Sequence, residues 1–157
     1  MKFKDWWNKE HSLPKNKKFS WRPSAYGFIM KRNQILLIKS RLHGMWECPG
    51  GGIELGEKIL DGLAREVYEE TGCKITVKNK QPLYTGDNYF FALNKDQYFH
   101  TIPMVFLTSP KGALKNAKPR DTKEVADIAW FDINKLPKPT NPMVIKAVKE
   151  YKKYAKQ

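Results

Sequence analysis

Three glutamates, Glu66, Glu69 and Glu70, lie within five positions of one another. In an α-helix, positions i, i+3 and i+4 are neighbours on one face, so these carboxylates would share an arc of roughly 100°. Like charges at this spacing repel, and Arg65, four positions before Glu69, cannot neutralise all three. A divalent cation can, and carboxylate oxygens are the ligands that Mg²⁺ prefers. The pattern therefore indicates either a metal-binding helix face or a solvated acidic surface.

A glycine-rich stretch precedes these acids, with glycines at positions 50–52 and 56. Backbone without a Cβ allows the close approach of an anion or a cation, although such a stretch is also typical of a sharp strand-to-helix turn. We expect the helix to run from about Lys58 to Thr71 and to end at Gly72, a residue that readily adopts the left-handed conformation. An apolar stripe would dock this helix on a sheet, through Leu60, Leu63, Ala64 and Val67.

The spacing over this whole segment is more specific than either feature alone. It consists of Gly51, five residues, Glu57, seven residues, Arg65-Glu66-Val67, one residue, Glu69-Glu70, one residue, Gly72 and the apolar Cys73. This frame resembles the Nudix box, the signature of the Nudix hydrolases, at every fixed position. The resemblance is strict over Gly51–Cys73 and extends loosely over residues 21–156 through the order of elements. It implies an α/β/α sandwich around a mixed sheet.

The resemblance also implies roles for individual residues. Glu66, Glu69 and Glu70 match the metal-binding glutamates, and the carbonyl of Gly50 would join the metal shell. The remaining box residues have structural or outer-shell roles: Gly51, Glu57 and Gly72, with Arg65 orienting the acids. In this family the catalytic base is a box glutamate in some members and an acid of a later loop in others. Glu124 is the candidate for the latter, and the alternative is an exposed loop carboxylate. The implied cofactor is Mg²⁺, with Mn²⁺ as an alternative.

Residues that select the substrate are expected outside the box. Arg22, Lys39 and Arg41 are candidates for contacts with phosphates, and Trp46 is a candidate for stacking on a base. Each of these side chains also has an ordinary structural interpretation, as solvated charge or as core packing. The same two interpretations apply to further aromatic residues, Trp21, Tyr26, Tyr89, Phe90 and Tyr98.

The apolar pattern predicts an α/β fold with a mixed sheet. We expect a hairpin of strands at residues 25–30 and 34–38, short strands at 45–48 and 73–77, and a long hairpin at 82–93 and 97–108. A loop at 109–122 and a strand at 128–131 would precede a final helix from Pro142 to about Lys156, with Asn141 as its N-cap. Residues 1–20 have no clear period, and Trp6-Trp7 would cover a core edge, form a dimer contact or stack on a base.

The composition fits one folded domain over residues 1–157, with residues 1–20 as an extension. Hydrophobic residues make up 41% of the chain and aromatic residues 13%, which argues against disorder. No apolar run approaches the ~20 residues of a membrane span, and the N-terminus lacks the apolar core of a signal peptide. The two cysteines, Cys48 and Cys73, form no metal-binding pattern, so we expect a cytoplasmic protein.

The net charge of +13 favours polyanionic partners such as nucleotides or RNA, although scattered lysines also simply add solubility. The leading hypothesis is a Mg²⁺-dependent pyrophosphohydrolase that acts on a nucleoside triphosphate or a nucleotide sugar. The alternatives are an RNA 5′-end pyrophosphohydrolase and a nucleotide-binding module without turnover. A homodimer is left open.

Overall fold

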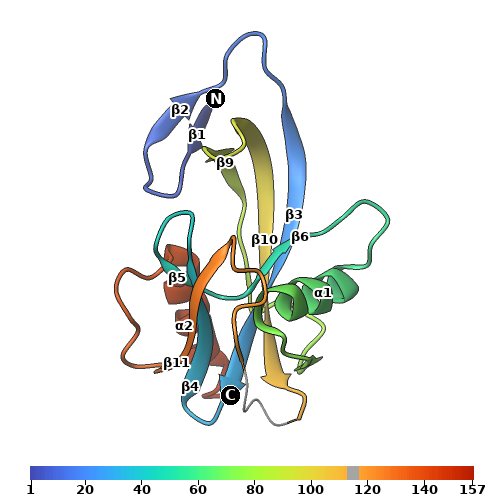
Figure 1. Ribbon diagram of the computed structural model, residues 1–157, viewed down its shortest axis with the longest axis vertical. Coiled ribbons are helices and arrows are strands. Elements are labelled where there is room, and N and C mark those ends of the chain that lie inside the picture. Colours follow the sequence, from blue (N-terminus) through green and yellow to red (C-terminus); the bar gives the residue numbers. More distant parts are fainter. Residues whose placement is uncertain (113–116) are drawn as a thin grey trace.

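The computed structural model describes residues 1–112 and 117–157, and it consists of a mixed β-sheet with two helices (Figure 1). The main order of the strands is β11-β4-β3-β10-β9-β1-β2, and β5, β6, β7 and β8 pair beside it. The strands are β1 (Lys2–Lys4), β2 (Glu10–Ser12), β3 (Phe19–Lys31), β4 (Gln34–Ser40), β5 (Trp46–Glu47), β6 (Gly50–Gly52), β7 (Ile75–Val77), β8 (Tyr84–Thr85), β9 (Asn88–Ala92), β10 (Gln97–Pro110) and β11 (Val125–Asp132). The helices are α1 (Ile59–Thr71) and α2 (Pro142–Tyr154).

Two long strands form the centre of this sheet. β3 and β10 pair in parallel from Phe19 with Tyr98 to Ile29 with Thr108, whereas their other neighbours pair antiparallel. Alternate residues of β3 project to opposite faces. Ala25 belongs to the core cluster beneath α1, and Phe28 belongs to the cluster beneath α2. The predicted α/β fold with a mixed sheet between helices is thereby confirmed.

Both helices follow the predicted pattern closely. In α1, Leu63 and Val67 are fully buried against the sheet, and Gly72 ends the helix with a φ of 69°. In α2, the Asn141 side chain accepts a hydrogen bond from the backbone N–H of Met143, so it caps the helix as expected. Neither helix is long and apolar enough to cross a membrane.

The N-terminal segment contains regular structure that its sequence did not reveal. β1 and β2 form an antiparallel hairpin, and β1 joins the sheet by pairing in parallel with β9 (Figure 1). Phe3 is fully buried there, in a small aromatic cluster with Phe91 and Tyr98. Of the two adjacent tryptophans, Trp6 packs on the Phe90 ring, which agrees with a cover over the edge of the core, whereas Trp7 is 59% exposed.

Several strand boundaries differ from the expectation. β3 begins at Phe19 and not at residue 25, and the glycines at positions 50–52, which were expected to form a loop or turn, form strand β6. β10 continues to Pro110, inside the predicted loop 109–122, because its last residues pair with β7. The predicted strand 82–93 is split into β8 and β9, which both pair with β10 on either side of Gly86. Residues 113–116 of the predicted loop lie outside the described residues.

Candidate active site

The glycines of β6 bring backbone directly against the carboxylates of α1. β6 pairs with β3 so tightly that a Cβ on Gly50 would lie 2.2 Å from the carbonyl oxygen of Ala25, and Gly50 has a φ of +148°. A Cβ on Gly51 would lie 2.6 Å from Oε2 of Glu66. The backbone contact at Gly50 requires glycine, whereas a methyl group at Gly51 would displace the Glu66 carboxylate, so the loop and the helix face form one compact site.

Arg65 connects the acids of this site to the loop. Its Nε and Nη2 atoms donate to the two carboxylate oxygens of Glu57, at 2.7 and 2.9 Å, which is the bidentate geometry suited to arginine. Its Nη1 atom donates to Glu66 at 2.9 Å and to Glu69 at 3.3 Å, and Nη2 also donates to the carbonyl of Gly52. The hydrogen bonds from Arg65 lower the pKa of Glu57 to about 2, so Glu57 remains ionised.

Glu70 is the most buried acid of the helix, with an exposed fraction of 7%. Its Oε2 atom accepts a hydrogen bond of 2.8 Å from the backbone N–H of Gly50. Burial, together with the negative charges of Glu47, Glu66 and Glu124, raises the pKa of Glu70 to about 9, against the opposing effect of the Gly50 N–H. Burial likewise raises the pKa of Glu66. Both shifts come mainly from burial of the carboxyl groups, and the neighbouring carboxylates add to them.

This crowding fits the chemistry of a divalent cation. Carboxylate oxygens of Glu66, Glu69 and Glu70 are hard ligands, and a cation would offset the burial and the repulsion that together raise the pKa of Glu70. Among residues 1–112 and 117–157, however, no three acidic, His or Cys side chains already converge on one point suited to a metal ion. Arg65 holds Glu66 and Glu69 in their present orientation, so binding an ion would require these side chains to turn.

Glu47 is an acid of this region that the sequence interpretation missed. It precedes Cys48 at the end of β5, and its charge contributes to the raised pKa of Glu70. Its carboxylate accepts a hydrogen bond of 3.0 Å from Asn141, and Nε2 of His43 lies 3.3 Å away. The only signal in the sequence was its place just before the glycine-rich stretch, where strand alternation puts it on the face opposite to Trp46.

The later acid, Glu124, lies in the turn before β11 and is exposed. Its charge acts on both Glu66 and Glu70 and raises the pKa of each, so the fold places it near the helix acids. The backbone carbonyl of Glu124 accepts a hydrogen bond from the backbone N–H of Arg41. The Arg41 side chain donates to the carbonyl of Thr122, so this arginine braces the loop that carries Glu124.

The other predicted substrate contacts differ in their surroundings. The guanidinium carbon of Arg22 lies 3.1 Å from the position of a Cβ on Gly52, so this cation borders the glycine-rich stretch. Lys39 is half-buried on β4. Trp46 lies in the core beneath α2, where its ring packs on Phe131 at 4.7 Å between centroids. Because this ring is buried, we do not retain Trp46 as a base-stacking residue.

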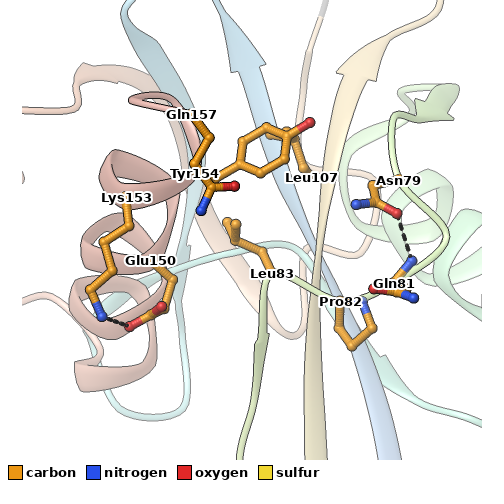
Figure 2. A pocket seen from close by; sticks show the side chains of 9 residues that line it. All are labelled: Asn79, Gln81, Pro82, Leu83, Leu107, Glu150, Lys153, Tyr154 and Gln157. Carbon is orange, nitrogen blue, oxygen red and sulfur yellow. Dashed lines mark hydrogen bonds and ion pairs between the residues drawn. The ribbon is translucent and has the colours of Figure 1, made fainter.

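A surface pocket lies elsewhere and contains none of these groups (Figure 2). It lies between the end of α2 and the segment before β8, and its one acidic side chain, Glu150, is paired with Lys153 at 2.9 Å. We therefore place the candidate site at the acidic face of α1 and not in this pocket.

Known proteins share both the sequence and the fold. Residues 21–151 match the family model described as NUDIX domain. A protein of Methanocaldococcus jannaschii named ADP-ribose pyrophosphatase is 36% identical over 115 residues, covering 71% of this chain and 62% of the relative. A Vibrio parahaemolyticus protein named NAD-capped RNA hydrolase NudC is 33% identical over 111 residues, covering 69% of this chain and 38% of the relative. The chain thus spans less than two thirds of the length of these relatives.

Solved structures agree on the fold. The crystal structure of a MutT NUDIX hydrolase from Burkholderia pseudomallei superimposes with a TM-score of 0.68 and 22% identity, covering 85% of this chain and 98% of that chain. The MutT protein from Methanosarcina mazei Go1 superimposes with a TM-score of 0.67 and 18% identity, covering 90% of this chain and all of the other.

Proposed function

The chain belongs to the NUDIX family, and we propose that it is a Mg²⁺-dependent pyrophosphohydrolase that cleaves a nucleoside diphosphate linked to another group. The observation that carries the proposal is the crowded acidic face of α1, where the pKa of Glu70 is raised to about 9 beside Glu66 and Gly51. Glu70 is buried, accepts a 2.8 Å hydrogen bond from a backbone N–H and is influenced by three other carboxylates, and such a perturbed acid is typical of a functional site.

For the substrate we favour a nucleoside diphosphate joined to a sugar, with nucleoside triphosphates second. The similarity to the protein named ADP-ribose pyrophosphatase supports this order, since ADP-ribose is such a compound. The net charge of +13 and the position of Arg22 beside Gly52 supply cations for the diphosphate.

In the proposed reaction, water attacks one phosphorus, and the P–O bond of the anhydride breaks to release a second phosphate-bearing group. A Mg²⁺ ion would be held by Glu66, Glu69 and Glu70 with the carbonyl of Gly50, and it would neutralise diphosphate charge and make hydroxide available near neutral pH. Mn²⁺ would serve in its place.

The residues of the chain then have separate tasks. Arg65 holds Glu66 and Glu69 through its hydrogen bonds until an ion binds, and it is itself fixed by Glu57. Glu124 is our candidate for the base that accepts the proton of the attacking water, because its charge reaches Glu66 and Glu70 from an exposed loop. Arg22 would contact a phosphate from the side of the glycine-rich stretch that lies opposite to Glu66.

The test is a hydrolysis assay on a panel of ADP-ribose, UDP-sugars and nucleoside triphosphates, with Mg²⁺, Mn²⁺ or a chelator. We expect metal-dependent turnover of a nucleotide sugar, and a loss on the order of 10²-fold or more in Glu69→Gln or Glu66→Gln. The matched control is Glu54→Gln, which removes an exposed carboxylate from the same loop and should retain full activity. Absence of turnover for every compound with both metals would refute the proposal.

A further inference from the structure

The central sheet extends beyond both helices (Figure 1). In the view of Figure 1, α1 and α2 cover its lower half, whereas β9, the upper ends of β3 and β10, and the β1–β2 hairpin lie above them. The core cluster beneath α1 begins on β3 at Ala25, four residues after Trp21. The upper part of the sheet thus has a face that neither helix covers.

Aromatic rings form a row across this uncovered part. His100 on β10 pairs with Trp21 on one side and with Tyr89 on the other, so the three side chains project to the same face. The Trp21 ring stacks on the His100 ring with a centroid distance of 4.1 Å and an interplanar angle of 21°, and the centroid of the Tyr89 ring lies 4.8 Å from that of His100. Trp21 is nevertheless 66% exposed and Tyr89 is 39% exposed.

Phe19 extends this row toward the N-terminal hairpin. Phe19 is 38% exposed, and the centroid of its ring lies 5.6 Å from that of Phe3. The Phe3 ring also packs on Tyr89 and Tyr98, with centroid distances of 5.4 and 5.0 Å. Because Phe3 is fully buried, the hairpin fixes the exposed rings from one side. We call Phe19, Trp21, Tyr89 and His100 the aromatic face. Rings that are held this way lose little further freedom when a flat ligand stacks on them.

Lysines lie beside one end of the aromatic face. Lys17 Nζ lies 6.0 Å from the centroid of the Tyr98 ring, next to Phe19, and Lys15 and Lys18 are exposed on the same segment. Two acids also lie here: Asp96 forms an ion pair with Lys17, and Asp87 is hydrogen-bonded to Nε2 of His100 at 2.5 Å. Rings bordered by cations, on a chain of net charge +13, suit a polyanion that carries flat bases.

We propose that the aromatic face binds a single-stranded nucleic acid, with bases stacked on Trp21 and Tyr89 and phosphates near the exposed Lys15 and Lys18. A second copy of the chain is a poorer occupant, because a two-fold interface would set this basic segment against itself. The strand would also lie close to the candidate active site. Trp21 is four residues from Ala25, which pairs with Gly51, and four residues of strand span about 13 Å.

The experiment measures binding without turnover, in a chelator, by fluorescence anisotropy with a labelled RNA single strand, the matching DNA strand and the RNA duplex. We expect both single strands to bind more tightly than the duplex, whose stacked bases cannot reach the rings, and an affinity that falls steeply with salt. The two single strands separate RNA from DNA as the ligand.

Trp21→Ala and Tyr89→Ala should each weaken single-strand binding roughly 5- to 100-fold, as expected for the loss of one stacked base. Trp7→Ala is the matched control, because it removes an exposed tryptophan outside the aromatic face and should leave the affinity unchanged. Equal binding of single strand and duplex, or no effect of Trp21→Ala, would overturn the proposal. A dimer that Trp21→Ala dissociates in sedimentation would assign the face to self-association instead. Since no step requires hydrolysis, failure here and failure of the proposed enzyme activity are distinguishable.

Discussion

Replacing Glu70 by glutamine should change how the stability of the metal-free protein depends on pH. Burial and the charges of Glu47, Glu66 and Glu124 raise the pKa of Glu70 from 4.5 to about 9. The folded state therefore holds this proton more tightly than the unfolded chain does. The resulting stability is fully present below the unfolded pKa of 4.5 and is lost as the pH rises through about 9.

The size of the effect follows from linkage. Between the two pKa values, one proton more is bound in the folded state, so the free energy of unfolding falls by about 1.4 kcal/mol per pH unit. From pH 6 to pH 8 the Glu70 contribution is about 3 kcal/mol, which lowers the melting temperature by roughly 5–10 °C in a domain of this size. The amide introduced by Glu70→Gln stays neutral and keeps an oxygen that can accept a hydrogen bond from the Gly50 N–H. The free energy of unfolding of this variant should therefore fall by about 3 kcal/mol less than that of the wild type between pH 6 and pH 8.

The assay is thermal unfolding in a chelator at pH 6, 7 and 8 for the wild type, Glu70→Gln and the control Glu69→Gln. The Glu69 side chain is 54% exposed, so its replacement should leave the slope close to that of the wild type. Added Mg²⁺ should restore the stability of the wild type at pH 8 and have little effect on Glu70→Gln. Parallel curves for the wild type and Glu70→Gln would refute our account of the buried carboxyl.

Three further predictions concern the same site. Gly51→Ala places a methyl group 2.6 Å from Oε2 of Glu66, so turnover should fall on the order of 10²-fold while the melting temperature changes little; unchanged kinetics would contradict the contact. Arg65→Lys cannot reproduce the bidentate pair with Glu57, and we expect turnover to fall roughly tenfold with a lower melting temperature, measured beside Lys58→Arg as an exposed control. Calorimetry in buffers of different ionisation enthalpy should detect release of about one proton when Mg²⁺ binds at pH 7, and none in Glu70→Gln; equal release in both proteins would exclude Glu70 as its source.

The helices were predictable because the sequence signals that define them lie within the helices or next to their ends. The stripe that includes Leu63 and Val67 repeats with the helical period, and Gly72 supplies the left-handed residue that ends α1. The N-terminal hairpin was not predictable in the same way. β1 and β2 have three residues each, too few to display a period, and β1 is fixed by pairing with β9, which is distant in the sequence. Burial of Phe3 depends on that distant pairing.

The candidate site was predicted only where its residues have a fixed spacing. The box frame placed the glutamates of α1 together, but local spacing suggested only the pair of Arg65 with Glu69. The stronger contact of Arg65 reaches back eight positions to Glu57, and it exists because the loop after β6 folds over the helix. Trp46 and Glu47 show the same limit, since alternation sends one into the core and the other toward the acids, and the sequence does not say which.

Two features allow the fold to tolerate the acidic face of α1 before an ion binds. Arg65 neutralises part of it, and the raised pKa of Glu70 keeps a second acid protonated at neutral pH. A cation that takes this place must displace the Glu70 proton and loosen Glu66 from Arg65, so part of its binding energy is spent on both steps. Metal affinity at this site should therefore rise with pH, and the environment of Glu70 sets where that rise occurs.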